Sequence, residues 1–526
     1  MSSYTPEEPI AAIATALAPS ALAVIRTSGK GCIDLVSHVF SRPEALKKAA
    51  GYTMLYGWIV DPASDSAGGL KAESSENKAS TAYKAGAARI DEVMLSVYRA
   101  PKSFTGEDMV EISCHGGTAP VMAVYRLLLK NGFRAAERGE FSFRAYVNGK
   151  TDLTRAEAIR EIIDSRTDES RSRAAGRLSG ALFDELARVK GLLIRTTASI
   201  EAEIEYPEDE ETIADAFDPA ELIEARDALA RLADTWAGEK LYQDGVRIVL
   251  SGRTNAGKSS LFNLLLKEER AIVSDIEGTT RDWIESWVSF GGIPARLFDT
   301  AGLRQSDDVI EQSGVERSLD LAEDADIVLY LADAGAGLLE DDIANIKKLS
   351  SSKAAGTQAL KAGDALSAAG VSGNSGLESR MILVWNKCDV ADGAAPAALK
   401  AADALSADDA LKTVLERVSQ VRISAKTGEG LPELMNGVHK LLSKQVSTSR
   451  QQAGLGSARQ KASVDEALDS LNHALCVIAP DADTGLGLDA VVQDIEDALD
   501  ALAEITGETS PDDILENIFA RFCVGK

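Results

Sequence analysis

The first residues whose types and spacing could do chemistry form the segment GRTNAGKS at positions 252–259. This segment follows the short apolar run 247–250 and precedes an apolar helical pattern that begins at Leu261. A glycine-rich loop between a strand and a helix lets backbone N–H groups close around phosphates. In such a loop Lys258 would reach the β- and γ-phosphates, and Ser259 would bind Mg²⁺. The spacing predicts a P-loop that holds a nucleoside triphosphate.

Three further motifs follow in the order found in guanine-nucleotide-binding domains. DTAG at 299–302 ends a strand candidate, which would bring a carboxylate near the metal and a glycine N–H near the γ-phosphate. NKCD at 386–389 also follows a strand candidate, and Asp389 can accept hydrogen bonds from N1–H and the 2-amino group of guanine. Adenine lacks that pair of donors. SAK at 424–426 supplies a last loop beside the base, so the four motifs predict a GTPase domain.

The residue that follows DTAG departs from the Ras-like pattern. Ras-like GTPases have a glutamine there that orients the attacking water, whereas this chain has Leu303, which cannot do so. Either hydrolysis is slow or another group acts. The side-chain carbonyl of Asn255 could help to hold a monovalent cation that neutralises charge as an arginine finger does. The alternative, that Asn255 is an ordinary loop residue, stays open.

The surrounding patterns predict the elements that position these motifs. Short apolar runs alternating with helices are typical of a parallel α/β sheet; its strand candidates are 247–250, 295–298, 327–331 and 382–385. Residues 1–145 contain strand candidates 21–26, 93–98 and 109–113 and a helix over 119–130. Helical periodicity marks 150–240, with an apolar stripe from Leu182 to Leu193, and returns after 445. Gly507 should stop one helix and Ser510 should cap the next.

The composition of the chain excludes several classes of protein. The 526 residues carry a formal net charge of -26, which argues against a broad nucleic-acid-binding surface. The five cysteines and four histidines show no metal-ligand spacing, and no stretch resembles a membrane span. The N-terminus lacks the basic residues of a signal peptide, so we expect a cytoplasmic protein. Segments 61–88 and 350–379 are rich in Ser, Ala, Gly and Lys and predict exposed loops, the second disordered.

Several segments beyond the nucleotide motifs resemble the tRNA-modifying GTPase family MnmE, also called TrmE. They are SDIEGTTRD at 274–282, SFTGEDMVEISCHGG at 103–117, GEFSFRAYVNGKTD at 139–152 and FCVGK at 522–526. The resemblance covers nearly the whole chain. It implies an α/β plus α+β protein: an N-terminal α+β folate-binding and dimerisation domain (1–145), a helical domain split in two (146–241 and 444–526, the latter with the CVGK tail), and a P-loop G domain inserted between the halves (242–443).

The resemblance also implies which residues serve the G domain. Asn255, Ser274, Ile276 and Thr279 would hold potassium, and Ser259 and Thr280 would hold Mg²⁺. Glu311, reached by counting without a gap from DTAGLR, would be the catalytic residue that orients the water through a second water. Thr254 stands where the loop often has Pro, and Ser274 where Thr is common. The contacts to GTP would be Asn255, Ala256, Gly257, Lys258, Ser259, Ser260, Ser274, Asp275, Ile276, Glu277, Gly278, Thr279, Thr280, Asp299, Thr300, Ala301, Gly302, Asn386, Lys387, Asp389, Ser424, Ala425 and Lys426.

The family resemblance assigns the remaining residues and partners. Arg26, Glu111, Lys150 and Lys526 would contact 5,10-methylenetetrahydrofolate or a formyl-tetrahydrofolate analogue. A homodimer would join the FAD-dependent MnmG (GidA) in a heterotetramer. Together they would place a carboxymethylaminomethyl or aminomethyl group on carbon 5 of the wobble uridine of certain tRNAs. Cys523 would be either a reactive thiol or a small residue packed beside Phe522.

Two other functions compete with this reading. One is a regulatory GTPase switch that modifies nothing, which the G domain does not exclude. The other is a folate-dependent enzyme that acts alone on a small molecule. The N-terminal segment and the tail disfavour the first, and the lack of a flavin or nicotinamide fingerprint disfavours the second.

Overall fold

The computed structural model describes residues 8–62, 88–205, 218–268, 285–299, 325–351, 380–390, 415, 417–443, 453–479 and 487–526. Most of segments 61–88 and 350–379, for which the sequence predicts exposed loops, lies outside the described residues. The chain forms two compact units, one of residues 1–160 with 503–526 and the other of residues 161–502. The domain boundaries expected from the sequence stay a prediction.

The first unit is built on a six-stranded sheet with the order β3-β4-β5-β2-β1-β6. Neighbouring strands are antiparallel except β1 and β6, which are parallel. The predicted strands at 21–26, 93–98 and 109–113 are confirmed as β2, β4 and β5. The strands are β1 (Ile10–Ile13), β2 (Leu22–Ser28), β3 (Thr53–Asp61), β4 (Ala88–Tyr98), β5 (Met109–His115) and β6 (Arg134–Ala135).

One face of this sheet carries the larger core. On the other face, residues of β1 and β5 pack in a smaller buried cluster with Phe141, whereas the part formed by β3 is open. Alternate residues of β4, such as Val93 and Leu95, are buried. They pack with residues of α1 (Cys32–Ser37), α2 (Pro43–Lys48) and α3 (Thr118–Lys130), which confirms the predicted helix over 119–130. Tyr56 of β3, one residue out of phase with the core positions, stays 53% exposed. At β3 the sheet therefore has the one-sided burial common in antiparallel sheets.

The end of the chain joins this first unit. Phe519 of α17 (Asp512–Phe519) lies at 5.4 Å from Phe143 of α4 (Glu140–Val147), ring centroid to centroid. Leu153 of α5 (Leu153–Asp164) and Phe522 complete the same buried cluster. An isolated β-bridge pairs Arg138 with Val524, so the tail lies along the segment that leads into α4.

The expected cap of the last helix is wrong. Pro511, with φ −55° and ψ 144°, occupies the cap position of α17, and no side chain caps the helix. The Ser510 hydroxyl instead donates to the Glu504 carbonyl at 3.2 Å. That carbonyl belongs to the last turn of α16 (Leu488–Thr506), where carbonyls lack helical partners and compete for donors. The predicted stop is confirmed, since α16 ends before Gly507, whose φ is 88°.

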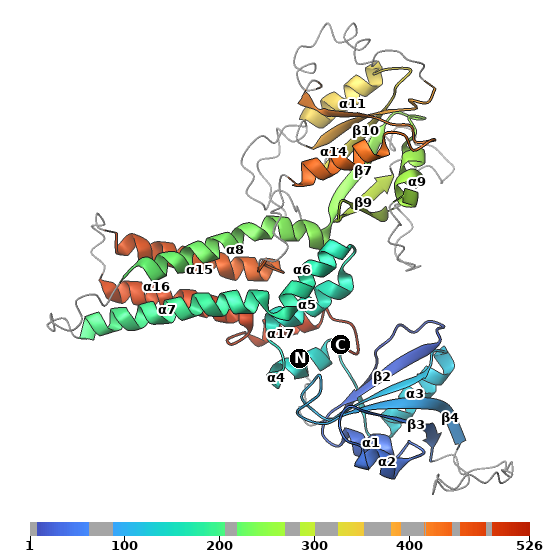
Figure 1. Ribbon diagram of the computed structural model, residues 1–526, viewed down its shortest axis with the longest axis vertical. Coiled ribbons are helices and arrows are strands. Elements are labelled where there is room, and N and C mark those ends of the chain that lie inside the picture. Colours follow the sequence, from blue (N-terminus) through green and yellow to red (C-terminus); the bar gives the residue numbers. More distant parts are fainter. Residues whose placement is uncertain are drawn as a thin grey trace. The chain divides into compact units, whose positions relative to one another are not determined.

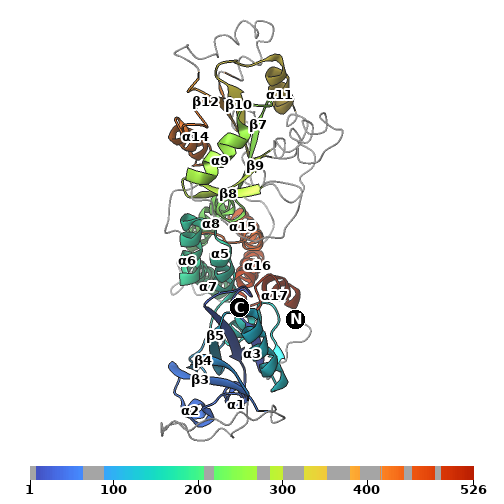
Figure 2. The same cartoon turned by 90° about the vertical axis from the view of Figure 1, so that its right-hand side faces the viewer.

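The second unit contains long helices that run alongside one another (Figures 1 and 2). α7 packs on α8 and α8 packs on α15. The predicted stripe from Leu182 to Leu193 is buried in α7, because residues at helical spacing share one face. The helices of this unit are α6 (Asp168–Ser179), α7 (Ala181–Glu205), α8 (Ala220–Asp244) and α15 (Ala458–Val477), with most of α16.

The α/β domain lies in sequence between α8 and α15. Its sheet has the order β12-β11-β10-β7-β9-β8 and is parallel except for the pair β8–β9. The four predicted strands are confirmed as β7, β9, β10 and β11. Bounds are β7 (Val246–Gly252), α9 (Lys258–Glu268), β8 (Glu285–Phe290), β9 (Ile293–Asp299), β10 (Ile327–Asp333), α11 (Glu340–Ser351), β11 (Met381–Asn386), β12 (Ser419–Arg422) and α14 (Leu431–Ser443).

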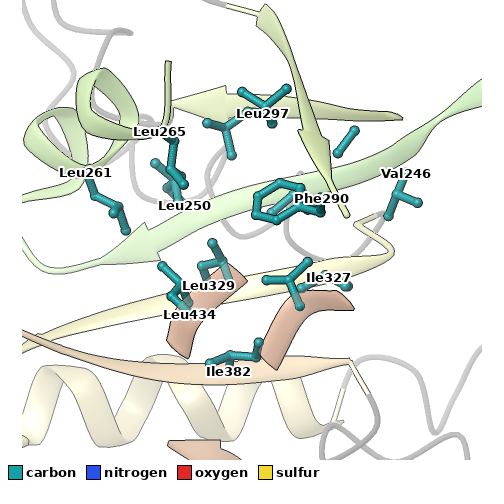
Figure 3. Packing of buried hydrophobic residues seen from close by; sticks show 14 of the residues in the cluster. Val246, Leu250, Leu261, Leu265, Phe290, Leu297, Ile327, Leu329, Ile382 and Leu434 are labelled. Atoms are coloured by element: carbon teal, nitrogen blue, oxygen red, sulfur yellow. The ribbon is translucent and has the colours of Figure 1, made fainter. Parts of the chain in front are cut away.

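Helices cover both faces of this second sheet. Leu261 and Leu265 of α9 and Leu434 of α14 pack on one face over Leu250 and Leu329 (Figure 3). Residues of α11 pack in a separate cluster with the other face, and Figure 2 shows α11 opposite α9 and α14. Since α8 and α15 pack together, the chain leaves a helical layer, builds the α/β domain and returns. The predicted fold class, a P-loop domain inserted between helices after an α+β domain, is confirmed.

Candidate functional site

The loop between β7 and α9 has the shape that the P-loop motif predicts. Gly252, Asn255 and Gly257 have φ of 133°, 63° and 96°. A Cβ on Gly252 would lie 2.3 Å from the Leu331 carbonyl oxygen, and one on Gly257 would lie 2.1 Å from Nδ2 of Asn386. Glycine is therefore required at both positions, and asparagine tolerates the left-handed backbone better than most residues.

Lys258 lies within this loop at the start of α9. Its side chain is buried, and Nζ donates to the carbonyls of Gly252 at 2.7 Å and Arg253 at 2.8 Å. Ser259 and Ser260 follow in the first turn of the helix, and both are exposed. The first turn of a helix presents unpaired N–H groups and a positive dipole end, so the loop and this turn form a cradle for an anion.

The predicted base-contacting loops meet this cradle through Asn386 at the end of β11. The buried Asn386 amide donates from Nδ2 to the Ala256 carbonyl at 2.8 Å and accepts at Oδ1 from the Ala425 N–H at 2.9 Å. Its side chain thereby links the P-loop to the SAK loop, of which Lys426 is the last residue. Three strands, β7, β11 and β12, deliver these segments at their carboxyl ends, where open α/β sheets bind ligands.

Asp389 is oriented by the SAK loop. Its Oδ1 accepts a hydrogen bond from Oγ of Ser424 at 2.7 Å, and that hydroxyl accepts from the Thr427 N–H at 3.2 Å. A carboxylate offers about four lone-pair positions. The remaining ones can accept the two donors on the edge of guanine.

Lys387 adopts a left-handed backbone with φ 64°, and its Nζ lies 3.0 Å from Oδ2 of Asp333. Burial raises the pKa of the Asp333 carboxyl, but the Lys387 hydrogen bond and the Gly335 N–H outweigh burial and lower that pKa. The sequence reading missed Asp333. Asp333 is the last residue of β10 and is level with Asn386 in the parallel register. That position at the carboxyl end of a strand is the signal that could have found it.

The rest of the predicted GTPase residues lie outside the described part of the chain. These are the switch residues Ser274, Asp275, Ile276, Glu277, Gly278, Thr279 and Thr280, the DTAG residues Thr300, Ala301 and Gly302, and the expected catalytic residue Glu311. Asp299 ends β9, and its backbone pairs in register with Leu250 of β7. The start of the DTAG motif therefore lies beside the strand that leads into the P-loop.

A second cluster forms in the first unit from three predicted residues, Arg26, Glu111 and Lys526. Arg26 of β2 and Glu111 of β5 face each other in register, with Nε and Oε1 3.0 Å apart. The Arg26 guanidinium also donates to the Gly525 carbonyl at 3.0 Å, which draws the tail to the sheet. Burial and the nearby Arg26 lower the pKa of Lys526. Lys150 donates from Nζ to the Pro101 carbonyl at 3.0 Å.

Aromatic residues that the sequence reading did not single out complete this cluster. The Arg26 guanidinium lies 4.9 Å from the ring centroid of Phe104 and 5.1 Å from that of Phe141. The Tyr98 hydroxyl lies 3.4 Å from Oε2 of Glu111. The two phenylalanines belong to the SFTGED and GEFSF segments, so these family-like segments are the sequence signal that could have identified them. Cys523 is exposed, whereas the neighbouring Phe522 is buried.

No group of three or more His, Cys, Asp or Glu side chains in the described ranges could hold a metal ion. Within the same part of the chain, no helix is long and apolar enough to cross a membrane.

Comparison with known proteins covers the whole chain. Residues 9–150 match the family described as GTP-binding protein TrmE N-terminus, and residues 153–523 match the MnmE helical domain. The chain is 45% identical over 530 residues to the tRNA modification GTPase MnmE of Treponema denticola, covering 99% of both chains. It is 35% identical to the protein of that name from Carboxydothermus hydrogenoformans, with 99% of this chain and 100% of the other covered.

Solved structures with some likeness contain G domains. The G domain of the FeoB iron transporter from T. maritima shares 22% identity, with 37% of this chain and 98% of that chain covered and a TM-score of 0.23. Era from Aquifex aeolicus bound to GDP·AlF4⁻ shares 24% identity, with 43% and 66% covered and a TM-score of 0.24. TM-scores this low support no conclusion about this chain. The two family matches and the full-length relatives show that the chain belongs to the MnmE (TrmE) family of tRNA modification GTPases.

Proposed function

We propose that this protein is a potassium-activated, cytoplasmic GTPase that takes part in modifying carbon 5 of the wobble uridine of certain tRNAs. The observation that carries the GTPase part is the Asn386 bridge, which joins the P-loop at Ala256 to the base-contacting loop at Ala425. The tRNA modification part is inferred from the relatives, which are named tRNA modification GTPase MnmE. The proposed domains are the folate-binding domain 1–145, the helical segments 146–241 and 444–526, and the G domain 242–443.

The proposed GTP site uses the phosphate cradle and the Asp389 carboxylate described above, with the switch and DTAG residues named from the sequence. Asp389 would select guanine, and Lys258 would move from the loop carbonyls to the β- and γ-phosphates. Glu311 would orient the attacking water. Replacing Glu311 with Ala should abolish turnover and spare GTP binding; retained turnover would exclude that role.

The proposed cation sites rest on two exposed side chains of the loop. Asn255 projects from a left-handed position at the mouth of the cradle and would hold K⁺ with Ser274, Ile276 and Thr279. Ser259, in the first helical turn, would hold Mg²⁺ with Thr280. Both offer the neutral oxygen ligands that such hard cations take. K⁺ would supply positive charge next to the transferred phosphoryl group.

Activation by potassium has a direct test. GTP turnover by the full chain should be faster in KCl than in NaCl at equal ionic strength, and Asn255→Ala should remove that difference. Asn255→Asp keeps a side-chain oxygen and tolerates the same backbone, so it should retain part of the activation. Equal rates in the two salts for the unmodified protein would exclude a potassium site.

The proposed folate site is the cluster around Arg26 and Glu111. A pterin ring carries several N–H donors that a carboxylate can accept, and the glutamate tail of a folate is anionic, which suits Lys150 and Lys526. The Phe104 and Phe141 rings beside Arg26 offer flat apolar surface. The residues present thus fit the cofactor, which when bound would supply the one-carbon unit.

Binding of 5-formyltetrahydrofolate, measured by calorimetry, tests this site apart from any GTPase activity. Arg26→Ala should weaken binding at least tenfold. Arg89→Ala is a matched control, because Arg89 lies in the same sheet and likewise stacks on an aromatic ring, that of Trp58 at 5.0 Å. Equal affinities of the two variants would exclude Arg26 from a folate site.

We also propose that two copies of the chain associate through the open part of the first sheet, formed by β3. Tyr52, Met54 and Tyr56 are 69%, 62% and 53% exposed on or directly before β3. A set of neighbouring exposed apolar side chains marks an interaction surface more often than scattered ones do. Met54→Glu should shift the protein from dimer to monomer in sedimentation velocity. An unchanged dimer would show that another surface pairs the chains.

The remaining partners follow from the family. An FAD-dependent MnmG protein would form a heterotetramer with the dimer and supply the redox cofactor, and the complex would act on tRNA. Nucleosides from the tRNA of cells that lack the gene should have lost the carboxymethylaminomethyl and aminomethyl groups at wobble uridines. An unchanged nucleoside profile would favour the alternative, a regulatory GTPase switch without modification activity.

A further inference from the structure

A buried carboxylate behind the phosphate-binding loop holds one of the loop's own side chains. We propose that Arg253, through its ion pair with Asp342 of α11, is a positioning residue for nucleotide binding. The inference rests on the proposed GTP site and adds to it a residue that touches neither phosphate nor base. Arg253 Nε lies 2.9 Å from Oδ2 of Asp342, whose side chain is 1% exposed.

Asp342 is fixed by the α/β fold itself. Its Oδ1 accepts from the Tyr330 hydroxyl at 3.0 Å, and Tyr330 belongs to the central strand β10 and is fully buried. Its Oδ2 accepts from the Leu339 N–H at 3.0 Å, directly before α11 begins. A carboxylate in the first turn of a helix satisfies an N–H that has no helical partner. The carboxylate therefore has a set position relative to both the sheet and α11.

A carboxylate buried in this way needs a positive partner. Moving an ionised carboxylate out of water is costly unless a cation or several donors compensate for the lost hydration. Two neutral donors come from Tyr330 and Leu339, and the Arg253 guanidinium supplies the charge. Burial and the nearby Asp342 raise the pKa of Tyr330, so that hydroxyl keeps its proton and stays a donor. The ion pair consequently fixes the Arg253 side chain to a rigid part of the domain.

The backbone of Arg253 carries this constraint into the phosphate cradle. Its carbonyl accepts from Lys258 Nζ at 2.8 Å and from the Ala256 N–H at 3.3 Å. Lys258 is the residue expected to reach the phosphates, and the Ala256 N–H is one of the donors of the loop. Arg253 is thus bonded through its side chain to Asp342 and through its carbonyl to two groups of the proposed nucleotide site.

The other fixed points of the loop lie on either side of Arg253. The backbone of Gly252 approaches the Leu331 carbonyl closely, and Asn386 holds the Ala256 carbonyl. Asn255 between them adopts a left-handed backbone, which costs energy for a residue other than glycine and persists only when surrounding contacts enforce it. The Arg253–Asp342 pair is such a contact, since it restrains the residue two positions before Asn255.

Loss of this pair should weaken nucleotide binding and leave the chemistry alone. Arg253→Ala should raise the dissociation constants of GDP and GTP by the same factor, about tenfold, as expected for neighbours coupled in one network. Because ground state and transition state use the same phosphate contacts, KM should rise while kcat at saturating GTP stays within about twofold. Arg253→Lys keeps the charge without the forked geometry and should recover part of the affinity.

The experiment is a double-mutant cycle on the full chain. Affinity for the N-methylanthraniloyl derivative of GDP is measured by fluorescence for the unmodified protein, Arg253→Ala, Asp342→Asn and the double variant. Asp341→Asn is the matched control, because Asp341 is the exposed neighbour in the same helical turn. Tyr330→Phe removes another partner of Asp342 without touching the loop. It should lower the midpoint of thermal unfolding and leave the affinity unchanged.

The results separate the inference from the function on which it rests. Support requires that Arg253→Ala and Asp342→Asn each weaken binding, that their effects do not add in the double variant, and that Asp341→Asn binds normally. Additive effects, an Arg253→Ala affinity within twofold of the control, or a loss of kcat instead of affinity would overturn the inference alone. If the unmodified protein does not bind the probe, both the inference and the proposed GTP site are wrong.

Discussion

Asp389→Asn should convert the guanine site into a xanthine site. In the proposed GTP site, the Asp389 carboxylate would accept hydrogen bonds from two donors of guanine, N1–H and the 2-amino group. The Ser424 hydroxyl, itself held by the Thr427 N–H at 3.2 Å, donates to Asp389 Oδ1 at 2.7 Å. In the variant this donor should keep the amide oxygen in the place of Oδ1. The amide NH2 is then directed at the base, where it opposes the 2-amino group of guanine.

The size of the effect follows from this geometry. The substitution removes one hydrogen bond to a charged acceptor and leaves two donors facing each other, at a cost of about 3–4 kcal/mol. That corresponds to a roughly 100- to 1,000-fold weaker affinity for GDP. Xanthine has a carbonyl oxygen where guanine has the 2-amino group, so the amide can donate to it. The variant should therefore prefer XDP over GDP.

Competition against a fluorescent guanine nucleotide measures this directly, with GDP, XDP and IDP as competitors. Inosine lacks the 2-amino group and should bind the unmodified protein about tenfold more weakly than GDP, because one bond to the carboxylate is lost. Ser424→Ala should reduce the preference of Asp389→Asn for XDP, since the amide then loses its orientation. If Asp389→Asn binds GDP within threefold of the unmodified protein, Asp389 does not read the base and the site is wrongly assigned.

Two further substitutions test how much ion pairs stabilise the protein, one in each of the two units. Glu239→Ala leaves the buried Arg173 and Arg177, held at 2.6 and 2.7 Å, each with one carboxylate partner fewer. It should cost about 3 kcal/mol of unfolding free energy, measured in urea by circular dichroism. The hydrogen bond that His115 Nδ1 donates to Asp91 Oδ1 raises the pKa of His115 above its ordinary value. Its stabilisation is present in full below the unfolded value and is lost as pH rises through the folded pKa, so His115→Gln should lower the unfolding temperature more at about pH 5.5 than at about pH 9.

Each of these has its own control. Glu224→Ala breaks the exposed pair with Arg188, and it should cost less than about 1 kcal/mol; a loss as large as that of Glu239→Ala would show that burial does not set the energy. For His115, a difference in unfolding temperature that is the same at both pH values would show that the ion pair with Asp91 makes no contribution.

The sequence by itself determined the nucleotide chemistry and most of the regular structure near it. P-loop, DTAG, NKCD and SAK are short segments whose function depends on contiguous residues at the end of a strand. For that reason their order and spacing could be read without a structure. Helical periodicity likewise predicted α7 and α16, because burial of one face leaves a regular trace in the chain. Short apolar runs predicted the four strands β7, β9, β10 and β11, because strands of a parallel sheet covered by helices are buried on both faces.

Only the tertiary structure decided which distant side chains meet. The pairing of Arg253 with Asp342, the Asn386 bridge and the bond from Arg26 to Gly525, 499 positions away, depend on how elements pack, and single charged or amide residues carry no periodic signal. The cap of the last helix shows the same limit, since the Glu504 carbonyl of the preceding helix took the Ser510 hydroxyl. Local patterns report what a segment prefers. The partners of a polar group depend on which donors and acceptors folding brings within reach of it.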